Sequence, residues 1–455
     1  MTMDTARDTA SRLNAGICSA RDVAEAALAK VARLNPELNV FAHLDPAKTL
    51  AEADAVDARR ATGEVMPLAG VPVVIKDNIW VAGRQITQGS KLFADFVPTC
   101  DAEAVKRLRG AGAVILGIGT CSEFACKGVT NTPLHGITRN PCDPTLTPGG
   151  SSGGPAAAVA AGFVPLALGT DAGGSSRRPP AHTGTVGFKP SQDAIPYGPD
   201  FAEPFWGISV LAPIAANVAD AALMFDVLAD LSAAPTPAPS RPLRIAFAPT
   251  LGLPVPMDDA VHEALAAVAA VLRAGGHDVM DAAPCWPAGI NPAALMPLQW
   301  AGLAALYGDR WIADQGLFDS DLGVQITAGL GLSGVDVARA LDAAQITRAV
   351  LRSFLAAYDV IVTATTPCPA WPIDRLGPAT IGGAPAASRD HAALTSQFNH
   401  AGLPVLSLPC GTTANGLPLG VQIGAGFGRD RQLLATAARF EILFARNGLT
   451  ALPSS

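Results

Sequence analysis

Short apolar segments alternate with helical patterns along most of the chain. Runs of strand length occur at residues 71–75, 114–116, 164–168, 244–248, 277–280, 360–363 and 405–408. Helical patterns occur at 103–111, 155–161 and 258–274, and a mainly helical stretch extends from 292 to 358. Such alternation is typical of an α/β sheet covered by helices on both faces.

The beginning of the chain is predicted to be helical. Ser19 is placed to cap a helix over residues 20–34, and Pro36 follows its expected end. A second helix is predicted to begin after Asp45 and to stop at Gly63. The clearest surface loop or internal boundary is the proline- and serine-rich stretch 231–242.

Composition narrows the class of protein. The 455 residues can form one large domain or two to three ordinary ones. The net charge is −7 with no basic run, which argues against a nucleic-acid or anionic-membrane surface. Residues 1–13 are polar and unlike a signal peptide, and the longest apolar stretch, 155–169, is too short and broken to span a bilayer. The eight cysteines lack metal-ligand spacing, which indicates buried, reduced thiols in a cytoplasmic protein without a metal site.

Lys76 directly follows the apolar run 71–75. Desolvation at the end of a buried strand would disfavour the ammonium and lower the pKa, as a lysine acting as a base requires. The alternative is a structural lysine paired with Asp77 or another carboxylate.

Two glycine–serine clusters are the other candidates for chemistry. The first, residues 149–154, contains Gly-x-Ser-x-Gly around Ser151, as in a nucleophile elbow, but residues 141–148 before it have a loop pattern where an elbow needs a strand. A phosphate-binding loop is disfavoured because no Gly-Lys-Ser or Gly-Lys-Thr follows.

The second cluster, residues 169–176, follows the predicted strand 164–168. Residues 169–174 are expected to be a loop whose free N–H groups could hold an oxyanion beside the attacking hydroxyl of Ser175. A purely structural loop with glycines at positive φ is the alternative. Cys121 and Cys126 lie nearby without a histidine or glycine-rich turn, so we expect them in the core.

These motifs resemble the amidase signature family along nearly the whole chain. The match comprises the GGSSGG cluster at 149–154, the alanine-rich helix, GTDAGGSSRRP at 169–179, the Gly-Phe-Lys-Pro turn at 187–190 and the VIKDN segment around Lys76. Further matching segments lie at 123–125, 139–141, 398–399, 402–404, 408–411 and 416–422. The resemblance implies a single large α/β domain with a central mixed, mostly parallel twisted sheet covered by helices on both faces. Residues 1–65 would pack on a core at 66–230 that carries the site, and residues 243–455 would complete the domain, with the pocket shaped by about 292–358.

The resemblance also implies roles for single residues. Ser175 would be the acylated nucleophile, Ser151 the bridging serine after a cis peptide, and Lys76 the base; the 24-residue step between the serines agrees with the family spacing. The oxyanion hole would be the backbone N–H groups of Ala172, Gly173, Gly174 and Ser175. Supporting residues would be Gly150, Ser152, Asp171 and Arg177, with Asp171 expected to orient the loop by accepting backbone hydrogen bonds. No cofactor and no metal is implied.

The function implied is hydrolysis of a small or medium carboxamide through an acyl-serine, by a cytoplasmic protein with no nucleic-acid or membrane partner and a possible homodimer. The alternative is the A subunit of a tRNA-dependent amidotransferase. Family arginines are absent around Asp193 and Ala215, and Gly117-Ile118 replaces a common Gly-Lys. Arg178 stands where the family is commonly apolar, and we expect it to cap the loop electrostatically rather than to face substrate.

Overall fold

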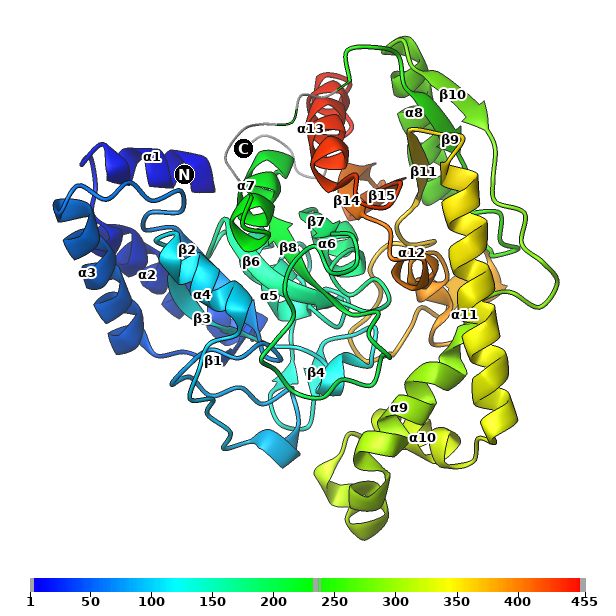
Figure 1. Cartoon of the computed structure of the whole chain (residues 1–455), viewed down its shortest axis with the longest axis horizontal. Helices are drawn as coiled ribbons and strands as arrows, with labels where there is room; N and C mark the ends of the chain where they lie inside the picture. Colours follow the sequence, from blue (N-terminus) through cyan, green and yellow to red (C-terminus); the bar gives the residue numbers. More distant parts are fainter. Residues whose placement is uncertain (1–3, 232–235, 237–238, 451–455) are drawn as a thin grey trace.

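An 11-stranded sheet runs through the centre of the computed structural model, which describes residues 4–231, 236 and 239–450 (Figure 1). The strand order across the sheet is β1-β3-β2-β6-β8-β7-β14-β15-β11-β9-β10. The strands are β1 (Phe41–His43), β2 (Pro72–Lys76), β3 (Val114–Gly119), β6 (Leu166–Asp171), β7 (Val186–Lys189), β8 (Val210–Ala215), β9 (Arg244–Phe247), β10 (Asp278–Asp281), β11 (Val360–Ala364), β14 (Val405–Thr412) and β15 (Pro418–Ala425). Two small hairpins lie outside it, formed by β4 (Asn131–Thr132) with β5 (Gly136–Ile137) and by β12 (Thr380–Ile381) with β13 (Ala384–Pro385).

The strand directions are mixed, as expected. Strand β2 pairs in parallel with β3 and β6, and β9 pairs in parallel with β10 and β11. The remaining neighbours, from β6 through β8, β7, β14 and β15 to β11 and also β1 with β3, pair antiparallel. Parallel pairing is therefore confined to two groups of three strands, separated by an antiparallel centre.

Helices cover both faces of this sheet, which confirms the α/β prediction (Figure 1). One face packs against α4 (Glu103–Gly110), α7 (Val218–Leu228), α8 (Asp259–Ala274) and α13 (Asp430–Arg446). The other face carries α2 (Ala20–Leu38) and the alanine-rich α5 (Gly153–Ala160). The remaining helices are α1 (Ala6–Asn14), α3 (Pro46–Ala61), α6 (Arg178–Thr183), α9 (Pro292–Ala313), α10 (Ser320–Leu330), α11 (Gly334–Leu355) and α12 (Ser396–Ala401).

Several local predictions are confirmed, but several boundaries are wrong: β3 and β14 extend beyond their predicted ends at 116 and 408, and so do α2 and β6. Ser19 caps α2 through a capping box, but the helix continues through Pro36 to Leu38, because a proline near a helix end removes only one backbone bond and Leu38 is buried. Strand β6 continues three residues beyond the predicted end at 168, through Asp171, because antiparallel pairing with β8 extends to that residue. The first part of the predicted glycine loop is therefore strand.

The sequence pattern does not predict β7, β8 and β15, although they lie at the centre of the sheet. Pro213 interrupts the apolar run of β8, and β15 contains two glycines and the buried Gln422, so neither has the appearance of a central strand. Residues 232–235 and 237–238 of the predicted loop at 231–242 lie outside the described residues.

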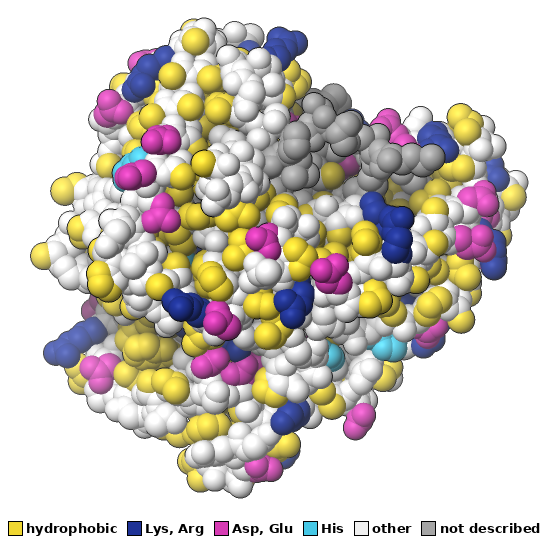
Figure 2. Space-filling model, turned by 180° about the vertical axis from the view of Figure 1, so that it is seen from behind, with side chains coloured by type: hydrophobic (Ala, Val, Ile, Leu, Met, Phe, Trp, Pro, Cys, Tyr) yellow, Lys and Arg dark blue, Asp and Glu magenta, His cyan; other side chains and the backbone are white. Residues whose placement is uncertain are grey.

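The surface charges, the helix lengths and the cysteines can each be compared with the predictions from composition. Figure 2 shows Lys and Arg side chains interspersed with Asp and Glu on the face opposite to that of Figure 1. None of the helices in the described part of the chain has both the length and the apolar character needed to span a bilayer. All eight cysteines are free, but only four are buried and Cys285 is exposed, so the prediction of buried thiols is wrong for the others.

Candidate active site

Lys76 ends β2 on the face of the sheet that packs against α5. Because side chains alternate along a strand, Lys76 shares this face with Val74, while Val73 and Ile75 enter the opposite core. Its side chain is fully buried, and its Nζ lies 2.7 Å from Ser151 Oγ and 2.8 Å from Thr170 Oγ1. Burial lowers the pKa of Lys76 from its ordinary value near 10.5 to about 8.

Asp77 is not the partner of this lysine. The Asp77 carboxylate accepts hydrogen bonds from the backbone N–H groups of Thr87 and Gly89, at 2.7 and 3.0 Å. The structural alternative of a Lys76–Asp77 pair is therefore wrong. No ion pair to Lys76 occurs among the described residues, and its hydrogen-bond partners there are two hydroxyls.

Ser151 lies in the turn that leads into α5. The Gly150–Ser151 peptide is cis, and no strand precedes it, so the segment is not a nucleophile elbow. Gly150 is needed at this position because a Cβ there would lie 2.7 Å from the backbone nitrogen of Val129. The neighbouring Ser152 donates from Oγ to the carbonyl of Thr170, at 3.3 Å, and so joins the turn to β6.

Asp171, the last residue of β6, shapes the loop that carries Ser175. Its carboxylate accepts from the backbone N–H of Gly174 at 2.7 Å and of Ser176 at 3.1 Å. Gly174 adopts a φ of +109°, and a Cβ there would lie 2.3 Å from Thr395 Oγ1. The loop therefore turns tightly between two bonds to one carboxylate, and Ser175 lies between them.

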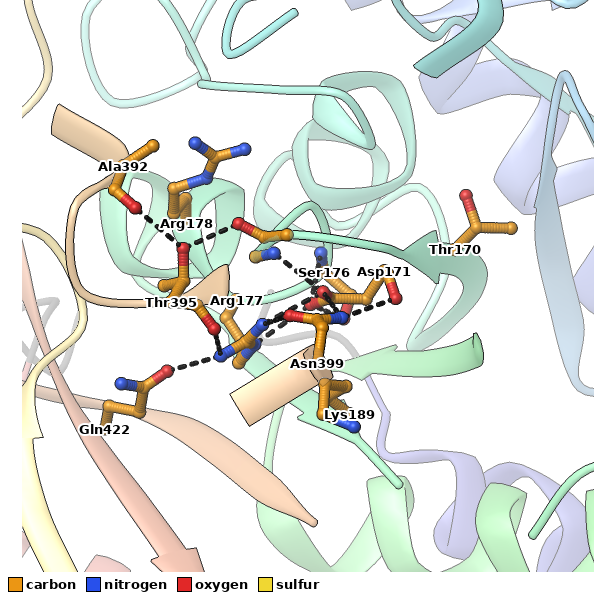
Figure 3. Close-up of polar contacts among 12 residues, drawn as sticks. Thr170, Asp171, Ser176, Arg177, Arg178, Lys189, Ala392, Thr395, Asn399 and Gln422 are labelled. Atoms are coloured by element: carbon orange, nitrogen blue, oxygen red, sulfur yellow. Dashed lines mark hydrogen bonds and ion pairs between the residues drawn. The ribbon is translucent and has the colours of Figure 1, made fainter. Parts of the chain in front are cut away.

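A buried ion pair anchors this loop to the C-terminal half of the chain (Figure 3). Arg177 and Asp171 are fully buried and 3.0 Å apart, and Arg177 also donates to Gln422 Oε1, Asn399 Oδ1 and the carbonyl of Thr395. Burial raises the pKa of the Asp171 carboxyl, but the Arg177 charge and hydrogen bonds outweigh it and hold that pKa well below the usual range. The carboxylate is charged, so it acts here as a fixed acceptor.

Backbone donors near Ser175 differ from the predicted set at one position. The N–H groups of Ala172, Gly173 and Ser175 make no hydrogen bond within the described residues, and these three residues line a cavity. Gly174 was expected to belong with them, but its N–H donates to Asp171. Three backbone donors, rather than four, are free to meet an oxyanion.

The cavity beside Ser175 has a volume of about 580 Å³. Its walls come mainly from apolar side chains of α9 and of the segments before it, including Phe205, Ile208, Leu253, Val255, Leu295, Met296, Leu298 and Trp300. The loop before α12 supplies part of the polar wall, with Ser388, Arg389 and Asp390. The described residues contain no group of His, Cys, Asp and Glu side chains arranged to hold a metal ion.

The structure brings Lys76 and Ser151 into direct contact, whereas Ser175 Oγ makes no hydrogen bond within the described residues. Hydrogen bonds of a catalytic relay often form only in the complex with substrate. Thr170 and Thr395 were not predicted as site residues: Thr170 lies in the matching segment 169–179 but was given no role there, and no motif distinguished Thr395. Asn399 and Gln422 lie in segments that match the family pattern, but that pattern gave them no role. Cys121 and Cys126 are buried, and burial raises both thiol pKa values, as expected for core residues.

Comparisons with known proteins define the class. A family model described as Amidase matches residues 22–434. An acylamidase of Rhodococcus erythropolis is 34% identical over 96% of this chain and 94% of its own length. The glutamyl-tRNA(Gln) amidotransferase A subunit of Roseiflexus castenholzii is 35% identical over 95% of this chain and 94% of its own. A solved 6-aminohexanoate cyclic dimer hydrolase superposes with a TM-score of 0.82 at 28% identity, covering 97% of each chain.

The fold and these relatives thus place the chain among enzymes that act on carbon–nitrogen bonds. It belongs to the amidase signature family.

Proposed function

We propose that this protein is a stand-alone amidase that hydrolyses small or medium carboxamides through an acyl-serine intermediate. The observation that carries the proposal is the buried contact of 2.7 Å between Lys76 Nζ and Ser151 Oγ, next to a cavity lined by Ser175. A lysine without a carboxylate partner and with a pKa of about 8 is neutral in a useful fraction of molecules near neutral pH.

The reaction begins with proton transfer along the three side chains. Neutral Lys76 takes the hydroxyl proton of Ser151, Ser151 takes that of Ser175, and Ser175 Oγ attacks the amide carbon. The oxyanion is stabilised by the free N–H groups of Ala172, Gly173 and Ser175, which the Asp171 carboxylate holds in place through its bonds to the loop.

The second half of the reaction reverses the proton path. The proton held by Lys76 returns through Ser151 to the departing amine as the carbon–nitrogen bond breaks, leaving an ester on Ser175. Water then attacks this ester with the same relay as base, and the carboxylic acid is released. The three side chains and the backbone donors suffice for these steps.

The test uses the purified chain and a panel of aliphatic, aryl and amino-acid amides, with ammonia or amine release as the measurement. Ser175→Ala is expected to abolish both turnover and labelling by a fluorophosphonate. Lys76→Ala is expected to lose most activity at every accessible pH. Full residual activity in either variant would refute the role assigned to that residue.

The A subunit of a tRNA-dependent amidotransferase is the second candidate, supported by the 35% identity to such a protein. Under this alternative the chain alone would hydrolyse no simple amide and would require partner proteins and tRNA. Linear rather than cyclic amides as substrates, the cytoplasmic location and the homodimer stay predictions. Light scattering of the purified chain measures the oligomeric state.

A further inference from the structure

Two arginine side chains line the cavity without a carboxylate partner in the described part of the chain. Arg178 begins α6, three residues after Ser175, and is only 7% exposed. The one hydrogen bond of its side chain within the described residues goes to the carbonyl of Gly150 at 3.3 Å, and its Nε has no partner there. Its guanidinium points away from the network around Arg177 and Asp171 (Figure 3). Besides its bond to the loop carbonyl of Gly150, Arg178 is one of the residues that line the cavity, which is where a side chain that faces substrate would lie.

Arg389 reaches the same cavity from the loop before α12. Its hydrogen bond runs to Gln325 Oε1 on α10, at 3.2 Å. Both arginines also line a smaller adjoining cavity of about 250 Å³. Burial and then the charge of Arg389 lower the pKa of Arg178 to about 9, and burial lowers the pKa of Arg389 as well. Each positive charge thus lies in the field of the other, and no described carboxylate pairs with either.

The two other charged residues on the wall of the larger cavity, Lys127 and Asp390, do not neutralise the positive charges of Arg178 and Arg389. Lys127 is paired with Asp319 and Asp321 of the segment around the start of α10, so its charge is already compensated. Asp390 is the one carboxylate among the described residues that line this cavity, and its Oδ2 accepts from the backbone N–H of Ala387. It forms no ion pair with either arginine. The cavity wall therefore combines many apolar side chains with two arginines that have no carboxylate partner among the described residues.

We propose that Arg178 and Arg389 bind a carboxylate of the substrate, so that the preferred amide carries an acidic group separated from the scissile bond by a hydrocarbon portion. The apolar side chains of α9 would hold that portion, and the two guanidinium groups would pair with the acid. Arginine suits this role because its N–H groups match the geometry of a carboxylate and remain charged. This inference rests on the proposed amidase function and adds the substrate class.

The carboxylate can belong to the acyl part or to the amine part of the amide, and two matched pairs distinguish them. The first pair is adipamate and its methyl ketone analogue, in which an acetyl group replaces the carboxylate. The second is N-acetyl-6-aminohexanoate, whose carboxylate is separated from the amide nitrogen by five methylene groups, and the corresponding methyl ketone. For each pair the ratio of kcat/KM for acid over ketone is measured. We expect a ratio of about 10 to 100 in one pair, the range that charge-assisted hydrogen bonds provide.

Arg389→Gln is the main variant, since Arg389 is itself half-buried in a mostly exposed loop and has no hydrogen bond to Ser151 or Ser175 within the described residues. The ratio is expected to fall toward one in this variant and in Arg178→Gln, and to stay at the wild-type value in Arg339→Gln, whose side chain is 77% exposed. A ratio near one for both pairs in the wild type, or an unchanged ratio in Arg389→Gln, would overturn the inference. If Arg178→Gln does not fold, Arg389→Gln alone decides.

A binding measurement separates this inference from the proposed reaction. Isothermal titration of the Ser175→Ala variant with sodium adipate needs no turnover, and the affinity is expected to weaken about 10-fold or more when Arg389→Gln is added. Should the Ser175→Ala enzyme still hydrolyse the ketone amides, the proposed nucleophile is wrong while adipate binding still tests the anion site. Equal adipate affinity in Ser175→Ala and in the double variant with Arg389→Gln would reject the anion site, whatever the outcome for the nucleophile.

Discussion

The charge state of Lys76 gives the sharpest prediction about this site. The pKa falls from 10.5 to about 8 because the ammonium is buried next to two hydroxyls rather than a carboxylate. This shift corresponds to about 3 kcal/mol of disfavoured charge. At pH 7 about a tenth of the lysines are then neutral, against about 0.03% for an unshifted lysine, a gain of about 300-fold in the competent form.

The rate of fluorophosphonate labelling at Ser175 reports this ionisation without a known substrate. The second-order rate constant is expected to rise about tenfold per pH unit below pH 8 and to level off above it, because the lysine must lose its proton before it can accept one. Labelling is followed by mass spectrometry on intact protein, with circular dichroism confirming the fold at each pH. A flat profile between pH 6 and 10 would refute the assignment of Lys76 as the base.

The variant Thr170→Val tests whether the midpoint of the pH profile of labelling belongs to Lys76. The variant removes one of the two hydroxyl oxygens that accept from Nζ, so the ammonium is less stabilised and the midpoint is expected to move about one unit toward acid. The other groups with pKa values of about 7 form no hydrogen bond or ion pair with Thr170 in the described part of the chain; they are Glu123, Lys189, Glu203 and Glu441. Thr347→Val is the control, since this buried hydroxyl has no partner among the described residues. A midpoint that stays in place or rises in Thr170→Val would contradict the reasoning.

Two further predictions concern the loop that carries Ser175. Asp171→Asn leaves Arg177 buried without its counter-charge and is expected to lower the free energy of unfolding by about 3 to 5 kcal/mol. The control is Asp374→Asn, at an exposed ion pair, which is expected to change the midpoint of urea unfolding little. Equal midpoints in the two variants would refute the prediction. Gly174→Ala is expected to lose more stability and labelling rate than Gly416→Ala, because both positions have positive φ but only the first would contact Thr395; equal losses would show that the contact is unimportant.

The sequence was sufficient to predict the local elements that present Lys76 and Ser151. A strand of small β-branched residues ending in a lysine, and an alanine-rich helix after a glycine–serine turn, follow from short-range patterns. The 24-residue spacing between Ser151 and Ser175 came from the family resemblance and not from these patterns. The sequence alone also left open whether Lys76 pairs with Asp77. The Asp77 carboxylate instead accepts hydrogen bonds from the backbone N–H groups of Thr87 and Gly89, and these bonds form only in the folded chain.

The contacts that the sequence did not predict are those between distant segments. Thr170 reaches Lys76 only because β6 continues past its apolar run, and this extension depends on pairing with the unpredicted β8. Arg178 and Arg177 are identical neighbours in sequence, yet one is satisfied by five hydrogen bonds and the other faces a cavity. Only tertiary packing distinguishes the structural arginine from the one available to a ligand.

Asp171 connects the formation of the site to the closure of the whole sheet. Its carboxylate holds the loop of Ser175 on one side and Arg177 on the other, and Arg177 is fixed by Asn399 of α12 and Gln422 of β15. These partners lie more than 220 residues further along the chain than Arg177. In the folded chain the loop beside Ser175 is therefore linked to the C-terminal strands as well as to β6. This connection is fully buried, whereas Arg178 and Arg389 line the cavity without a carboxylate partner among the described residues, so the proposed substrate selection is assigned to the cavity wall and not to the Asp171 network.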